Sequence, residues 1–196
     1  MWTLKPKGTF SIKSAWQGFR KPHFEVLWWK SVWFKRHVPR WAIIQWIAAW
    51  GRLSTKDILL SLGIVTDAKC VLCDIDRESH NHIFSSVFVW KQLLARNNIC
   101  QDPGCLAQDL EWTTQNKEGE GLHNILYKLS LAATLYHLWR ERSFRVFQDK
   151  KEDPVRVVQK IISDLRVCMS AWRNFKRTPL NQRICQDWNV SCNIQV

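Results

Sequence analysis

Glycine and proline are scarce in this 196-residue chain, which has seven of the first and six of the second. Disordered and low-complexity chains are usually poor in apolar residues, whereas 46% of this chain is apolar, a normal value for a folded protein. The length suffices for one ordinary domain or two small ones. The composition therefore predicts a folded protein rather than a disordered one.

Long hydrophobic runs are also missing. No uninterrupted apolar segment approaches the roughly 20 residues that a helix needs to cross a bilayer, and the opening MWTLKPKGTF has no apolar signal-peptide core. We therefore expect no membrane association and a nuclear or cytoplasmic protein that is not secreted. Because seven cysteines is an odd number, we expect thiols that are free or bound to a metal.

Acidic residues are nearly absent from the first third of the chain. Residues 1–56 hold eleven Lys or Arg and a single acid, Glu25, for a net charge of +10, whereas the remainder holds eighteen bases and sixteen acids. A basic segment of this kind favours a polyanionic partner, most simply RNA or DNA. A solvated basic face that only keeps the protein soluble is the alternative, and charge alone does not decide between them.

Tryptophan, by contrast, is abundant, with thirteen residues. Such large rings imply either a bulky core or surfaces that meet a partner. Basic side chains and tryptophan rings alternate between residues 28 and 36. The lysines and arginines could neutralise phosphates, and exposed rings could stack on the unpaired bases of a nucleic acid. The candidate nucleic-acid-binding residues are Lys30, Lys35, Arg36, Arg40, Arg52, Trp28, Trp29 and Trp33. We expect other tryptophans to pack in the core, namely Trp41, Trp46, Trp50, Trp139 and Trp172.

The hydrophobic periodicity predicts a mainly α fold, with helices over residues 41–50, 55–62, 122–147 and 154–175. Ser54 is the expected N-cap of the second helix and Gly63 its left-handed C-terminal cap. Asp153 and Pro154 are the expected N-cap and first residue of the last helix. Residues 83–98 read as a short strand or helix.

The chain divides into three expected parts. Residues 1–99 would form a small helical domain, residues 100–121 a linker, because they hold a Pro-Gly turn and polar runs, and residues 122–196 a two-helix C-terminal segment.

The stretch CVLCDIDRESHNH, residues 70–82, has the spacing of a zinc site that lacks one ligand. Cys70 and Cys73 can reach one metal, and His82 follows at a plausible distance, but a structural zinc site takes four ligands. On an extended segment His80 would face the same side as His82 and could join them. Cys100 could fold back, without a geometric reason to do so. The alternative is two reduced cysteines beside surface histidines.

The order of these signals resembles the reverse-transcriptase zinc-binding domain found downstream of the polymerase in plant non-LTR (LINE-type) retrotransposons. The similar pieces are GTFSIKSAW, VPRWAIIQWIAAWGRLSTKDILLSLGI, CVLC, ESHNHIF and VWKQLL, and YHLWRERSFRVF resembles a stretch that commonly follows them. The resemblance implies zinc as the cofactor and Cys70, Cys73 and His82 as ligands. The family places its last cysteine five residues after the histidine, where this chain has Val87. We therefore expect the zinc knuckle, which is the loop of residues 70–82 with its ligands, to lack one ligand.

Catalytic signatures are missing as well. A reverse transcriptase needs clustered aspartates that hold magnesium, and neither Tyr127 nor Tyr136 leads an acidic pair. No glycine-rich phosphate loop follows a strand, and no histidine has an obvious serine or cysteine partner. We therefore expect a non-catalytic nucleic-acid-binding module, a stranded fragment of a longer polyprotein. The alternative is a structural domain whose tryptophan-rich helical faces meet a protein partner, without metal or nucleic acid.

Overall fold

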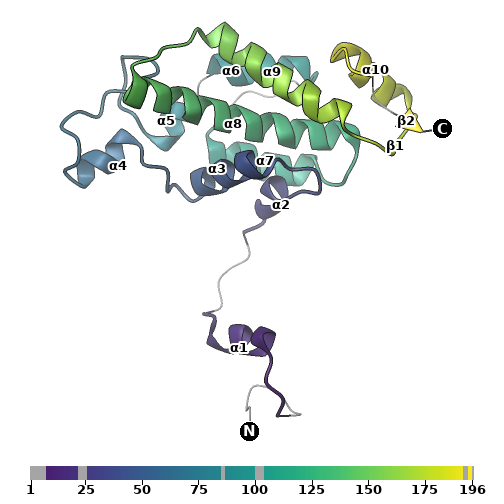
Figure 1. Cartoon of the computed structure of the whole chain (residues 1–196), viewed down its shortest axis with the longest axis horizontal. Coiled ribbons are helices and arrows are strands. Elements are labelled where there is room, and N and C mark those ends of the chain that lie inside the picture. Colours follow the sequence, from purple (N-terminus) through teal and green to yellow (C-terminus); the bar gives the residue numbers. More distant parts are fainter. Residues whose placement is uncertain (1–7, 22–25, 85–86, 100–103, 192–193, 196) are drawn as a thin grey trace.

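The protein is mainly helical, as the periodicity predicts. The computed structural model describes residues 8–21, 26–84, 87–99, 104–191 and 194–195, and Figure 1 shows the arrangement of their helices. In chain order the elements are α1 (Ile12–Phe19), α2 (Trp29–Val32), α3 (Pro39–Ala49), α4 (Lys56–Ser61), α5 (His80–Phe84), α6 (Val87–Arg96), α7 (Leu106–Asn116), α8 (Leu122–Gln148), α9 (Pro154–Ser170), β1 (Phe175–Lys176), α10 (Pro179–Asp187) and β2 (Ile194–Gln195).

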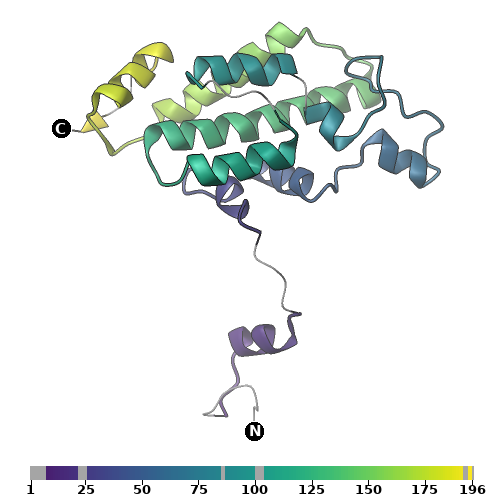
Figure 2. The ribbon, with the colours of Figure 1, turned by 180° about the vertical axis from the view of Figure 1, so that it is seen from behind.

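The long helix α8 organises the body, and Figures 1 and 2 show it running along the middle of the molecule. It contacts α2, α3, α5, α6, α9 and α10. Most of its residues between Leu122 and Arg142 are buried, as expected for a helix that is covered on several sides. Within the described part of the chain, one hydrophobic cluster extends from Val32 to Trp188 and so includes residues on both sides of the expected linker.

The segment expected as a linker contains the helix α7. Cys105 is its N-cap, and Leu106 and Leu110 are buried. Trp112 packs against Tyr127 of α8 with ring centroids 5.2 Å apart. Gln108, Glu111, Gln115 and Asn116 lie on the exposed face of this amphipathic helix, so the structure places a docked helix within the segment where the sequence suggested a connection.

The helix ends follow the expected capping chemistry at three positions and differ at one. Asp153 accepts a hydrogen bond from the Val155 N–H, and Pro154 is the first residue of α9. Gly63 follows α4 with a φ of 68°, the left-handed conformation that favours glycine. The expectation for Ser54 was wrong: the N-cap of α4 is Thr55, because the Lys56 N–H is bound by the carboxylate of Glu78 at 2.7 Å.

The C-terminal part holds more structure than two helices. Helix α9 ends at Ser170, five residues before the expected end, and Asn174 adopts a left-handed φ of 65°. Phe175 and Lys176 then pair in parallel with Ile194 and Gln195. Between these short strands lies α10, capped by Thr178. No clear hydrophobic period marks α10 in the sequence, because only Ile184 and Cys185 of its nine residues are buried.

Helix α1 stands apart from the helical body in Figures 1 and 2. Its N-terminus forms a capping box between Ser11 and Ser14. Ile12, Trp16 and Phe19 are exposed. In the described ranges no helix combines the length and the apolar character that a membrane span requires.

His137 is a buried titratable group between α8 and α9. Its Nε2 atom lies 3.1 Å from Oδ2 of Asp164. Burial lowers the pKa of His137 below the ordinary value of 6.5; Asp164 counteracts this shift, while the charges of Arg140 and Arg40 add to it. The folded protein therefore binds a proton at this site less readily than the unfolded chain does.

Acidification should destabilise the fold through this group. As the pH falls below 6.5, the unfolded chain protonates His137 before the folded protein does, so the free energy of unfolding decreases. We expect His137→Gln to show a smaller decrease than the unchanged chain, as measured by urea unfolding of metal-free protein above and below that pH. An equal decrease in the two proteins would contradict this assignment.

Candidate metal centre

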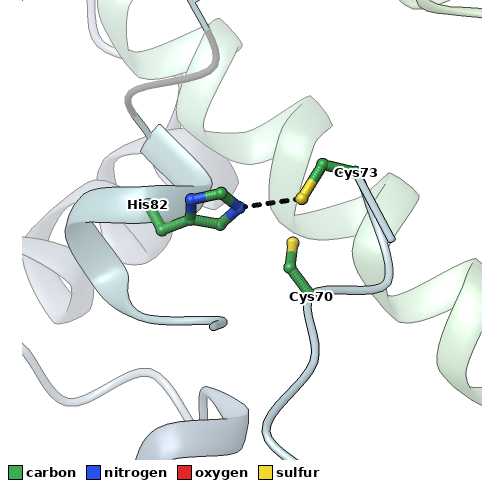
Figure 3. A group of neighbouring side chains, drawn as sticks. All are labelled: Cys70, Cys73 and His82. Carbon is green, nitrogen blue, oxygen red and sulfur yellow. Dashed lines mark hydrogen bonds between the residues drawn. The ribbon is translucent and has the colours of Figure 1, made fainter. Parts of the chain in front are cut away.

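The loop that carries Cys70 and Cys73 is a tight turn closed by backbone hydrogen bonds. The Cys70 N–H donates to the Asp76 carbonyl at 2.8 Å, and the Asp74 N–H donates to the Cys70 carbonyl at 2.9 Å. Asp74 adopts a left-handed φ of 57°, and Lys69 and Arg77 form an antiparallel bridge at the base of the loop. This geometry turns both sulfur atoms toward the same side, as Figure 3 shows.

Backbone N–H groups point at both sulfur atoms. Leu72 donates to Sγ of Cys70 at 3.3 Å, and Ile75 and Asp76 donate to Sγ of Cys73 at 3.4 and 3.5 Å. Burial raises the pKa of Cys70. Burial also opposes ionisation of Cys73, but the hydrogen bonds from Asp76 and Ile75 outweigh it and lower the pKa of that thiol. Donors arranged in this way stabilise the thiolate form that metals bind.

His82 completes a group of three donors. It lies on α5, whose first turn is anchored by a hydrogen bond from the His82 N–H to Oγ of Ser79 at 3.2 Å. Nε2 of His82 lies 3.2 Å from Sγ of Cys73, and the donor atoms of Cys70, Cys73 and His82 all lie within 4.8 Å of one another (Figure 3). In a tetrahedral zinc site, Zn–S and Zn–N bonds of about 2.3 and 2.1 Å set neighbouring donors roughly 3.5–4 Å apart. The two thiols and the imidazole therefore fit zinc.

His80 does not join this group, contrary to the expectation from an extended segment. Residues 80–84 form α5, and two residues along a helix turn a side chain to the opposite side. Nε2 of His80 instead accepts a hydrogen bond from the Leu53 N–H at 3.0 Å, and its Nδ1 lies 3.5 Å from Oγ1 of Thr55. Burial lowers the pKa of His80. His80 thus holds the loop before α4.

Among the residues that the structure describes, the group has three protein ligands and no fourth. Val87, at the position that the resemblance gives to the last cysteine, carries no donor. Cys100 lies outside the described residues. Of the described cysteines, Cys70, Cys73, Cys105 and Cys168 are free thiols. Cys185 is disulfide-bonded, which departs from the expectation of thiols that are free or on metal.

Three residues that surround the centre were not predicted from the sequence. The carboxylate of Glu78 is fully buried and accepts hydrogen bonds from Nε and Nη2 of Arg142 at 3.2 and 2.9 Å. Arg145 donates from Nη1 to the carbonyls of Val71 and Leu72, each at 3.0 Å. Glu78 stands in ESHNHIF, and both arginines stand in YHLWRERSFRVF. All three residues therefore lie in motifs that carry the family resemblance, but nothing in either motif indicates that the two segments contact each other.

Two of the candidate nucleic-acid-binding lysines lie beside acidic side chains. Lys35 pairs with Glu120 at 3.1 Å, and Lys30 lies 4.0 Å from Glu118. These are exposed pairs, which contribute little and are readily exchanged for other partners.

Arg36 and Arg40 are both engaged with the C-terminal part of the chain. Arg36 donates to the Arg173 carbonyl at 2.9 Å and covers the ring of Phe175 at 4.6 Å. Arg40 lies 3.8 Å from Asp164. Both side chains therefore carry structural contacts in addition to their charge.

The tryptophans are distributed differently from the expectation. Trp29 and Trp33 are partly exposed, whereas Trp28 is half-buried and packs edge-on against Trp50 with centroids 5.6 Å apart. Trp46 and Trp50 were expected in the core but are 42% and 46% exposed. The helix α3 is apolar nearly all round, so its sequence does not show which rings face the core.

The first half of the chain also matches a known family model. Residues 10–93 match the model described as zinc-binding in reverse transcriptase. The match supports a reverse-transcriptase zinc-binding domain. It spans less than half of the chain and includes all three ligands, whereas Arg142 and Arg145 lie outside it. Comparison with curated proteins and comparison with solved structures returned no match.

The centre makes a direct prediction about metal retention. We expect His82→Ala to lose zinc, because it removes one of three ligands, and His80→Ala to retain it, because His80 contacts Leu53 rather than the sulfur atoms. Metal analysis after dialysis against a weak chelator measures both. Equal zinc loss in the two variants would contradict the assignment of His82, and not His80, to the ligand set.

Proposed function

We propose that the protein is a non-catalytic nucleic-acid-binding module whose knuckle holds zinc, derived from the region downstream of the polymerase in a plant non-LTR retrotransposon. The colinear order of its motifs supports the retrotransposon origin, and we expect it to act in the nucleus or cytoplasm. When bound, zinc would supply a Lewis-acidic cross-link between Cys70, Cys73 and His82. The loop that carries Cys70 and Cys73 is held by backbone hydrogen bonds of the chain itself.

The observation that carries nucleic-acid binding is the presence of exposed rings and exposed cations on the same elements. Trp29 and Lys30 lie on α2, and Trp33 follows directly after that helix. Arg40 and Trp46 lie on α3, and Trp50 follows directly after it. The guanidinium of Arg52 lies 5.7 Å from the ring centroid of Trp50. Proteins that bind single strands combine cations for the phosphates with rings on which bases stack.

This chemistry favours single-stranded nucleic acid over duplex. A duplex hides its base faces, whereas unpaired bases can stack on exposed tryptophans. Such stacking is tolerant of sequence because every base has an aromatic face. We therefore propose RNA or DNA single strands as partners, bound with little sequence preference.

A protein partner is the second candidate, and one observation favours it. Ile43, Trp46 and Trp50 are all exposed on one stripe at helical spacing along α3. An exposed apolar stripe is typical of helix-in-groove recognition. Association through this stripe would depend weakly on salt, whereas nucleic-acid binding depends on it steeply.

Binding to fluorescent single-stranded RNA and DNA, followed by anisotropy at several salt concentrations, tests the proposal. We expect Arg52→Glu to weaken binding and to make the slope of log affinity against log salt shallower by roughly 0.7–0.9 for each phosphate that the variant no longer neutralises. We expect Trp46→Ala to cost roughly 1–3 kcal/mol, the usual effect of removing one stacking ring.

Lys91→Glu is the matched control, because it makes the same charge change on α6, away from the exposed tryptophans of α2 and α3. An equal reduction of affinity in Arg52→Glu and Lys91→Glu would show that only the net charge of the protein matters. That result would contradict a binding surface at α2 and α3. Absence of binding at low salt would exclude the function.

A further inference from the structure

We infer that Arg142 and Arg145 of α8 are positioning residues of the metal centre, so that the centre is a composite of the knuckle and a helix outside the matched segment. The inference rests on the zinc part of the proposed function and not on nucleic-acid binding. It makes the loop geometry depend on residues more than sixty positions away in the sequence.

The first contact is a buried ion pair at the base of the knuckle. Glu78 and Arg142 have side chains that are 0% and 3% exposed, with Oε1 and Nη2 2.9 Å apart. Oε1 of Glu78 also accepts the Lys56 N–H at 2.7 Å. The Glu78 N–H donates to the Ala68 carbonyl at 2.7 Å, which closes the loop that carries Cys70. Arg142 thereby fixes one end of the loop to α8.

The second contact lies inside the loop, between the two cysteines. Nη1 of Arg145 donates to the carbonyls of Val71 and Leu72, the residues that separate Cys70 from Cys73. Its Nε donates to Glu141 at 2.7 Å, and its Nη2 donates to the Glu152 carbonyl at 3.2 Å. A guanidinium held on all sides in this way is a rigid support, because its planar fork leaves few alternative orientations.

These contacts have a specific consequence for metal binding. The Leu72 N–H that donates to Sγ of Cys70 belongs to the residue whose carbonyl Arg145 holds. Fixing the peptide groups of residues 71 and 72 therefore fixes both the spacing of the cysteines and the N–H group that donates to Sγ of Cys70. Groups that orient metal ligands in this way typically change metal affinity 10–100-fold when they are removed.

Arg145→Met in the full chain is the main test variant, because it removes the donors while preserving most of the side-chain volume. We expect zinc affinity, measured by competition with a chromophoric chelator, to fall about tenfold or more. The cobalt-substituted protein should show an altered ligand-field spectrum. In the metal-free protein, the backbone amides of Cys70 and Asp74 should exchange hydrogen faster. Arg145→Lys should partly restore all three, since one cation can still reach a carbonyl.

Arg142 needs a paired variant, because its removal alone would leave Glu78 buried and unpaired. Glu78→Gln/Arg142→Met keeps an acceptor for the Lys56 N–H and removes both charges. We expect it to weaken zinc binding as well.

Two controls separate positioning from general destabilisation. Arg140→Met changes a neighbouring arginine that covers Phe144 instead of the knuckle. Ile161→Val lowers stability in the core at a buried residue of α9. Both should leave zinc affinity and the cobalt spectrum unchanged.

Unchanged zinc affinity in Arg145→Met and in the paired variant would overturn the inference, even if amide exchange became faster, while leaving the zinc assignment intact. If the protein without any substitution binds no zinc, both the inference and the zinc assignment are overturned. Loss of nucleic-acid binding alone would bear only on the proposed function.

Discussion

The carboxylate of Glu78 is the point on which the arrangement of the centre depends. One buried oxygen atom receives hydrogen bonds from Arg142 of α8 and from the first N–H of α4. A buried carboxylate needs such partners, since breaking a buried pair by removing one member costs roughly 3–5 kcal/mol. Because Glu78 also closes the knuckle through its backbone, helix α4, the metal loop and α8 take their relative positions from a single side chain.

Much of the fold follows from patterns within short windows of sequence. An apolar stripe predicts that α9 packs on the preceding helix, and α9 does contact α8. The stripe consists of Val155, Val158, Ile162, Leu165, Met169 and Trp172. Its register is only partly right, because Val155 is exposed whereas Val157 and Ile161 are buried. Asp153 caps the start of α9 and Gly63 follows the end of α4, as local capping chemistry requires. The spacing of Cys70 and Cys73, with His82 after them, also predicts the three donors that converge. The signal for each of these features lies within one short stretch of the chain, which is why the sequence reveals it.

The features that the sequence did not reveal depend on distant partners or on a change of local structure. Ser54 is a residue type that often caps helices, yet the N-cap of α4 is Thr55. Glu78, 22 positions away, accepts the first N–H of that helix. His80 points away from His82 because residues 80–84 form a helix instead of an extended segment. The exposure of Trp46 and Trp50 is set by which side of α3 faces α8, and an all-apolar helix carries no trace of that choice in its sequence.

The knuckle is therefore ordered by two independent sets of contacts. One is the ligand set, which has three protein donors in the described residues, so that a bound metal would contribute less to order than in a closed four-ligand site. The other is the pair of arginines on α8, which holds the loop through Glu78 and through the carbonyls of Val71 and Leu72. This second set fixes the segment that carries Cys70 and Cys73, in a chain that has Val87 at the position that the resemblance gives to the fourth ligand.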